Sequence, residues 1–322
     1  MDALVELFSQ AQSWLFQAAV QPALFALGLA GFLEDGYAGT GWFLVGLLQL
    51  GVIVLLIGPL ERWRPVEAVT DRATVRTDIV YTALHRLGLF RMVVFFTLAP
   101  WVDSAIGVLR LHGLTTLQLD DLWPGLTDLP WVSVLMYLVV FDFLNYWFHR
   151  AQHHWEWWWQ LHSLHHAQRQ MTMWSDNRNH LLDDLIKDLF FTLVALAIGV
   201  APGQFVAIVA FTQVSESFQH ANVRLWFGAV GERLWVSPRF HRLHHGVGIG
   251  HESEVKGSST TVLGGHNFGV LLPCWDILFG TADFRYQFEP TGVRNQVQEG
   301  VDYGRGFWSQ QWLGLRRLWK HP

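Results

Sequence analysis

The chain has 322 residues, of which 51% are hydrophobic and only 15% are charged. Soluble domains carry roughly a quarter charged residues, so this composition argues against a soluble globular protein. The formal charge of −5 gives no basic field for nucleic acid. One cysteine excludes a disulfide framework and a cysteine-based metal site, and we expect this residue, Cys274, to be buried. The unusual count is histidine: 16 in all, with 13 of them between His149 and His266.

Two uncharged stretches, residues 13–32 and 41–60, have the length of about 20 residues that spans a bilayer. We interpret both as transmembrane helices. The first contains Gln17, Gln21 and Pro22, which leaves a buried helix of a soluble protein as the alternative. No cationic leader precedes it and no small-residue cleavage site follows it, so a removed signal peptide is not expected.

Two further spans are expected at residues 79–101 and 131–147. The first of these is interrupted by His85, Arg86 and Arg91, whose side chains must turn toward the interface or the interior of the bundle.

Residues 189–211 are also apolar, but Gly199 and Pro202 break the run near its centre. Halves of about 11 residues are too short to cross singly, so a re-entrant helical hairpin is expected here.

The loops predict an orientation. Residues 61–91 contain six arginines, whereas residues 103–130 contain one arginine and four aspartates. Positive loops face the cytoplasm, which places the N-terminus, the histidine region and the C-terminal tail on that side.

We treat 1–322 as a single membrane-embedded domain, with mainly membrane spans at 1–140, a histidine-box catalytic region at 141–284 and a cytoplasmic C-terminal tail at 285–322. The expected fold is an all-α integral membrane protein. It would have about four transmembrane helices, a re-entrant helical hairpin, and a cytoplasmic helical cap that holds a histidine-rich dimetal site.

Three motifs carry the chemistry: one HxxxH pair and two HxxHH triplets. Their members are His149 and His153; His162, His165 and His166; and His241, His244 and His245. At about 100° per residue, a straight helix would place His162 opposite His153, so the chain must bend between them, at residues 155–159. The tryptophans of that WEWWW run suit the headgroup layer of a membrane, and this interpretation is favoured over substrate stacking.

Clustered cationic imidazoles would repel one another, and clustered neutral ones would leave nitrogens unpaired, whereas a divalent metal resolves both problems. Eight imidazoles exceed what one ion can use, so two metals are implied. Imidazole suits zinc, copper, nickel and iron alike. The lone histidines His85, His112 and His321 are expected to be structural.

The segments HRAQH, HSLHH, QHANV, SPRFHRLHH and HNFGVLLPCWDILFGT follow one another between residues 141 and 284. In this order they resemble the fatty acid hydroxylase and sterol desaturase superfamily of integral membrane non-haem diiron enzymes. The resemblance implies that the eight box histidines hold two irons that activate dioxygen. It adds His220 as a ninth ligand, and His180, a position often occupied by histidine in bacterial members, as a tenth candidate.

Two features depart from the family pattern. The segment between His245 and Asn267 is longer than usual and brings in His251, expected in a surface loop, and His266, whose role is left open. Arg224 stands where some fatty acyl hydroxylases have a further histidine, which weakens an assignment to acyl 2-hydroxylation.

The resulting hypothesis is an oxidoreductase that hydroxylates an unactivated C–H bond of a lipid (a sterol, a fatty acyl chain, an ether lipid or a carotenoid), with lipid desaturation as the alternative. Its cofactors would be two iron ions, with dioxygen as co-substrate. A separate redox partner, either a cytochrome or ferredoxin type of carrier or a small reductant, would supply electrons.

A zinc hydrolase or a divalent-metal transporter is the alternative of another class. The sequence lacks the His-Glu-x-x-His motif expected of a zinc hydrolase. A transporter should hold its ligands at the bilayer midplane, whereas these histidines lie at the helix ends and beyond. No catalytic residue is expected beyond the metal ligands. Acceptors for their second ring nitrogens are sought among Asp142, Asn145, Glu216 and Asp183 or Asp184.

Overall fold

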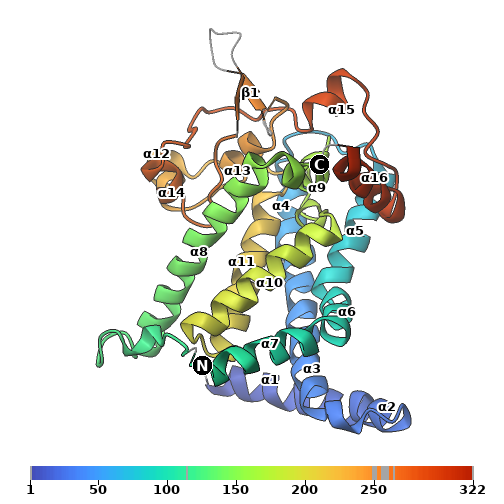
Figure 1. Cartoon of the computed structure of the whole chain (residues 1–322). Helices are drawn as coiled ribbons and strands as arrows, with labels where there is room; N and C mark the ends of the chain where they lie inside the picture. The colour runs from blue at the N-terminus through green and yellow to red at the C-terminus, as the bar shows by residue number, and fades with distance from the viewer. Residues whose placement is uncertain (1, 114, 249–251, 255–260, 264, 321–322) are drawn as a thin grey trace.

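The computed structural model describes residues 2–113, 115–248, 252–254, 261–263 and 265–320, and their regular structure is almost entirely helical, as expected (Figure 1). The elements before the histidine region are α1 (Asp2–Leu15), the π-turn η1 (Phe16–Val20), α2 (Gln21–Ala26), η2 (Ala30–Phe32), α3 (Leu33–Val52), the π-turn η3 (Ile53–Ile57), α4 (Gly58–Trp63), α5 (Arg72–Arg86), α6 (Leu89–Thr97), α7 (Ala99–Leu111) and η4 (Leu119–Asp121).

The remaining elements carry or surround the histidines. They are α8 (Pro130–His154), α9 (Glu156–His166), η5 (Ser175–Asn177), α10 (Leu181–Ile198), α11 (Pro202–Gln219), α12 (Gly228–Leu234), α13 (Pro238–His244), the antiparallel strands β1 (Glu252–Glu254) and β2 (Thr261–Leu263), α14 (Cys274–Leu278), α15 (Arg294–Gln298) and α16 (Phe307–Lys320).

Two segments are long and apolar enough to cross a membrane, Ala30–Trp63 and Pro130–His154. They contain the expected spans 41–60 and 131–147. A third candidate is the pair α5 and α6, bent by 50°, which overlaps the expected span 79–101. The bend falls at Gly88, whose φ of +75° is readily adopted only by glycine. Within the described residues, candidate spans therefore number two or three, where about four were expected.

The expected span 13–32 is not among these candidates. Helix α2 ends at Ala26 and the chain turns at Gly28, which has a φ of +71°, so no single helix covers those residues. Instead α1 and α2 lie across the lower end of the bundle, against α3 (Figure 1). A side-chain hydrogen bond from Gln12 Nε2 to the carbonyl of Tyr37, 2.8 Å, joins α1 to α3.

The expected hairpin is present as α10 and α11, joined at Gly199. Each arm has 18 residues, about 27 Å at 1.5 Å per residue. The arms are longer than the apolar halves that predicted them, because each helix continues into a polar turn near the histidines. Phe141, Phe191 and Ile208 form the core between α8 and this hairpin.

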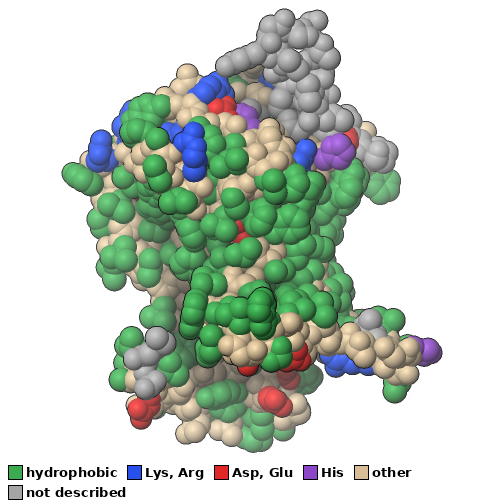
Figure 2. Space-filling model, turned by 90° about the vertical axis from the view of Figure 1, so that its left-hand side faces the viewer, with side chains coloured by type: hydrophobic (Ala, Val, Ile, Leu, Met, Phe, Trp, Pro, Cys, Tyr) green, Lys and Arg blue, Asp and Glu red, His purple; other side chains and the backbone are tan. Residues whose placement is uncertain are grey.

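The cap gathers at the upper end of the bundle, where α9 and α12 to α16 surround the ends of α8, α10 and α11 (Figure 1). Figure 2 shows hydrophobic side chains over the middle height of one face, with Lys and Arg gathered near the cap. Cys274 is exposed there, contrary to expectation. It begins α14, a short helix whose buried member is Asp276.

Candidate metal centre

The first two histidine motifs lie on two consecutive helices. Helix α8 ends at His154, Trp155 adopts an extended conformation with φ −92° and ψ 124°, and α9 begins at Glu156. The predicted bend in the WEWWW run is therefore confirmed. It turns α9 back so that His162 approaches His149, with ring centroids 5.3 Å apart.

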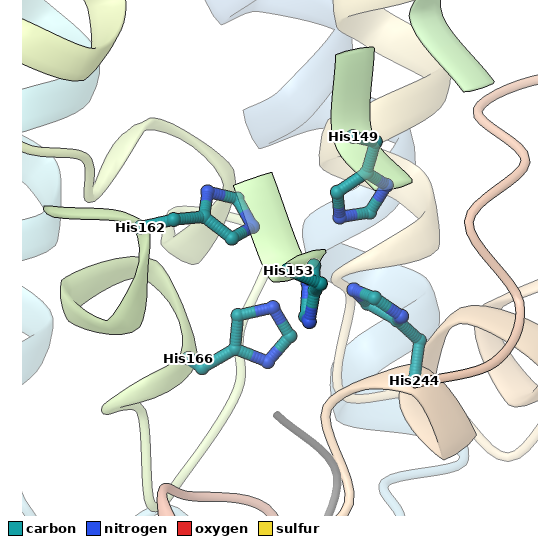
Figure 3. Close-up of side chains that lie close together, drawn as sticks. All are labelled: His149, His153, His162, His166 and His244. Atoms are coloured by element: carbon teal, nitrogen blue, oxygen red, sulfur yellow. The ribbon is translucent and has the colours of Figure 1, made fainter. Parts of the chain in front are cut away.

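The structure assembles one cluster of five imidazoles from three helices (Figure 3). Each of the five histidines offers one ring nitrogen, and these five nitrogens lie within 4.8 Å of one another. The members are His149 and His153 from α8, His162 and His166 from α9, and His244 from α13.

A second cluster of four lies beside the first. Its members are His165, His220, His241 and His245. Their Nε2 atoms form a chain in which His165 to His220 is 3.2 Å, His220 to His241 is 3.1 Å, and His241 to His245 is 3.1 Å. Two nitrogens that bind one metal ion at about 2.1 Å lie about 3.0–3.4 Å apart. The spacing of the second cluster therefore suits a common ion.

The triplets divide between the clusters by a simple rule. His162 and His166, four residues apart, share the first cluster, and His241 and His245 share the second. The middle histidine of each triplet joins the other cluster. Helical positions i and i+4 differ by about 40° in direction and i and i+3 by about 60° on the opposite side, so one helix can serve two ions. The rings of His166 and His245 stack where the clusters meet, with centroids 4.3 Å apart.

Four cluster histidines use the second ring nitrogen to contact an acceptor. His162 Nδ1 lies 3.2 Å from Asp183 Oδ2. The other three face main-chain carbonyls: His149 that of Phe268 at 3.0 Å, His244 that of His266 at 2.7 Å, and His220 that of Glu216 at 2.8 Å. Such contacts fix the tautomer in which Nε2 has a free lone pair for a metal.

Among the acceptors sought in the sequence, only the Asp183 carboxylate has this role. It also accepts hydrogen bonds from Gln152 and Trp158. Glu216 serves through its main chain, while its carboxylate lies 3.6 Å from Lys187 Nζ. The others bond elsewhere: Asp142 accepts from the main chain of 271 and 272 and from Trp275, Asn145 donates to the carbonyl of Phe141, and Asp184 pairs with His85.

A main-chain carbonyl that faces a histidine cannot be predicted from side-chain type. Two of these carbonyls, those of 266 and 268, belong to one segment, and side chains of the HNFG and WD motifs hold that segment in place. Asp276 accepts hydrogen bonds from the main chain of Phe268 and Gly269, at 2.8 and 2.7 Å. Asn267, at φ +61°, bonds through its side chain to the main chain of Phe240 and Asp283. The HNFG and WD parts of the sequence thus aim the carbonyls of 266 and 268 at the histidines.

The clusters have the chemistry of a metal site. The Nε2 atoms of His162, His166 and His244 are buried and have no hydrogen-bond partner, which is costly unless a cation takes the lone pair. Burial lowers the pKa of His165, His166 and His241 well below the usual range, and that of His220 to about 4. These four rings are therefore neutral at physiological pH, the form that binds metals.

His180 lies outside both clusters. Both of its ring nitrogens are engaged: Nδ1 accepts the main-chain N–H of Leu182 and so caps α10, and Nε2 lies 3.0 Å from the carbonyl of Gln311. His266 is outside the clusters too, and its Nε2 lies 3.7 Å from Asp283. His251 and His321 lie outside the described residues.

A cavity touches both clusters from the side of the helical bundle. His149 and His162 line it from the first cluster, and His165, His220 and His241 line it from the second. Most of its remaining wall comes from α8, α10 and α11, with Asp176 of η5, Asn179 and Val270, and it is largely polar, as at Lys187 and Glu216.

Comparison with known families places these clusters in context. Residues 134–281 match the model of the fatty acid hydroxylase family. Over these residues the chain is similar to that family. All nine clustered histidines fall within the match.

Several curated proteins are similar to this chain. The ornithine lipid hydroxylase OlsE of Rhizobium tropici is 27% identical over 283 residues, covering 84% of this chain and 78% of that protein. The alkylglycerol monooxygenase of Xenopus tropicalis is 26% identical over 221 residues, covering 66% of this chain and 48% of that protein. The fatty acid hydroxylase vlmA of a Lecanicillium species is 26% identical over 180 residues, covering 51% and 46%.

The chain thus spans most of the first relative and about half the length of the other two. These relatives are hydroxylases and monooxygenases, which confirms the expected oxidoreductase class. No solved structure matches the chain.

Proposed function

We propose that this chain is a membrane-bound oxygenase that hydroxylates a C–H bond of a lipid at a site holding two iron ions. The observation that carries the proposal is the pair of buried histidine clusters, each able to hold a metal, with one cavity touching both. The proposed ligands are the five histidines of the first cluster and the four of the second. We do not include His180, since both of its nitrogens are otherwise bonded.

Bound iron would supply the activation of dioxygen and the oxidation of the C–H bond. The chain's own residues prepare the place for it. Neutral imidazoles present lone pairs without adding negative charge, and Asp183 with the carbonyls of 216, 266 and 268 holds four of the rings in position. The histidines of both clusters are buried, so the ions would be held away from bulk solvent.

The proposed substrate class rests on the candidate membrane spans and on the relatives. Helix α8, which carries His149 and His153, is itself a candidate membrane span, so the histidines lie at the end of a segment that a lipid can contact. The ornithine lipid hydroxylase is similar along most of this chain, which makes an acyl lipid with a polar amino-acid headgroup the first substrate to test and an ether lipid the second.

Purified, iron-loaded protein in lipid vesicles tests the proposal. Metal analysis should find about two irons per chain; one zinc and no iron would contradict it. Incubation with ornithine lipid, an alkylglycerol and a sterol under oxygen-18, with a chemical reductant, should give one product heavier by one labelled oxygen. A product that has lost two hydrogens and gained no label would instead show desaturation.

The proposed orientation places the clusters on the cytoplasmic face, where a separate electron donor would reach them. It is supported by the four arginines at positions 62, 64, 72 and 76, which lie in or beside the loop between α4 and α5. A cysteine placed in the cap would then be labelled by an impermeant maleimide only after the cells are opened.

A further inference from the structure

The last helix, α16, has an apolar stripe that no part of the described chain covers. Trp308, Trp312, Leu315 and Trp319 are 79%, 67%, 42% and 88% exposed. They follow one another at intervals of four, three and four residues, so at about 100° per residue they lie within about 60° of one another. Three tryptophans in one such line make a continuous aromatic surface.

Polar contacts on one flank of the stripe, from Gln311, and on the opposite side of the helix, from Arg317, fasten α16 to the protein. Gln311 is buried, and its side chain donates to Tyr81 Oη of α5 at 2.9 Å and accepts from the main-chain N–H of Leu181 at 2.9 Å. Arg317 lies over the ring of Tyr303, 4.2 Å from its centroid, and its Nε donates to the carbonyl of Gln160 in α9 at 3.4 Å. The helix is therefore an ordered part of the cap, and its orientation is fixed.

This arrangement reverses the usual pattern of a surface helix, because buried glutamines face the protein and exposed tryptophans face outward. Exposure of such an apolar stripe to water is unfavourable, so a water-facing surface would not be expected to carry it. Tryptophan combines a large apolar ring with one N–H donor, which suits the headgroup layer of a bilayer.

Position and charge point to the same occupant. Helix α16 lies at the cap end of the bundle, beside α5 and α9 (Figure 1). Exposed tryptophans also mark the cap ends of the candidate spans, with Trp63 at the end of α4 and Trp155 directly after α8. Next to the stripe, Arg316 and Lys320 are exposed and can meet anionic headgroups.

We propose that α16 is an interfacial helix, with the stripe formed by Trp308, Trp312, Leu315 and Trp319 inserted into the headgroup and upper acyl layer of the leaflet nearest the cap. Because α16 is fastened to α9, which carries His162, His165 and His166, the insertion fixes the height of the metal centre above the acyl chains. This inference rests on the membrane location of the chain and not on the proposed reaction.

Spin labelling tests the proposal on the full chain, and the single cysteine makes it practicable. In a Cys274→Ser background, a nitroxide is attached at Leu315→Cys and the protein is placed in vesicles of phosphatidylcholine and phosphatidylglycerol. Oxygen concentrates in the bilayer and a nickel chelate in water. Relative to a control label at Arg305→Cys, we expect oxygen collisions to rise and nickel collisions to fall, each by about threefold.

The control position is exposed and lines the polar groove on the cap, so its label samples water. Equal nickel accessibility at both positions would overturn the proposal. Strong dipolar broadening between labels at 315 would also overturn it, since it would show a second copy of the chain against the stripe. If Leu315→Cys does not fold, Trp319→Cys provides the same measurement at a side chain that is 88% exposed.

Discussion

At the scale of single residues, the chemistry depends on which nitrogen of each ring is free. In the part of the chain that the structure describes, four cluster histidines contact an acceptor through Nδ1, and the acceptor of His162 is a carboxylate. That carboxylate, Asp183, also takes hydrogen bonds from Gln152 and Trp158 and is almost completely buried. A change of Asp183 should therefore disturb the metal centre without removing a proposed ligand.

We predict that Asp183→Asn weakens iron retention by about 10–100-fold, because the neutral amide no longer favours the required tautomer of His162. Competition with a chelator measures the change. The matched control is Asp184→Asn, which alters the neighbouring carboxylate, whose ion pair is with His85 and not with a cluster histidine. Equal retention in both variants would show that Asp183 does not position the ring.

Removal of a proposed ligand should act on one cluster more than on the other. His165 belongs to the second cluster and His244 to the first, so each alanine substitution should reduce bound iron to about one ion per chain or less and abolish turnover. His112→Ala, at an exposed histidine of the α7 end, should leave both unchanged. Similar losses in all three variants would contradict the assignment of ligands.

At the scale of helices, the bundle brings α5 close enough to anchor the metal centre. Arg86 is buried and donates to Asp176 at 2.8 Å and to Ser217 at 3.0 Å, which joins α5 to η5 and α11. Its main chain approaches α3 so closely that a Cβ added to Gly46 would lie 1.7 Å from the Arg86 carbonyl oxygen. The close crossing of α3 and α5 therefore requires glycine.

Gly46→Ala should destabilise the protein by about 1–3 kcal/mol, because the two backbones must move apart. Gly51→Ala, in the same helix, is the matched control: its added Cβ meets nothing within 4 Å, and alanine is the better helix former by about 1 kcal/mol. Thermal unfolding in detergent compares them. If Gly51→Ala is as unstable as Gly46→Ala, the close approach of α3 and α5 does not require glycine at position 46.

At the scale of the whole molecule, burying nine imidazoles couples stability to pH. The pKa of His165, His166, His241, His244 and His245 lies well below the usual value in the folded chain, and that of His220 is about 4, because burial opposes their protonation. In the unfolded chain these rings titrate near 6.5. Below that pH the unfolded state binds more protons, so folding stability falls as pH falls.

Metal-free protein in detergent should therefore unfold at a lower temperature at pH 5.5 than at pH 7.5, with the loss beginning near pH 6.5. Bound metal should diminish the effect until protons displace it. A melting temperature that does not change between these pH values in the metal-free protein would show that the rings are not buried and neutral.

Much of this molecule could be predicted from the amino-acid sequence. The apolar stretches at 41–60 and 131–147 identified the two strongest spans, because bilayer thickness sets a length that composition reveals. Histidines four residues apart identified the shared helical faces. Eight imidazoles are more than one ion can bind, which implied two metals. The bend after His154 followed from helix geometry alone.

Only the tertiary structure decided how these parts combine. It divided each triplet between two clusters and placed the carbonyls of 216, 266 and 268 where they face histidine rings. It placed His180 at the N-terminus of α10, where its side chain caps the helix. It also broke the expected span 13–32 at Gly28 and turned the tryptophans of α16 outward. Local periodicity fixes which side chains share a helical face, whereas the partner that each face meets depends on contacts between residues far apart in the chain.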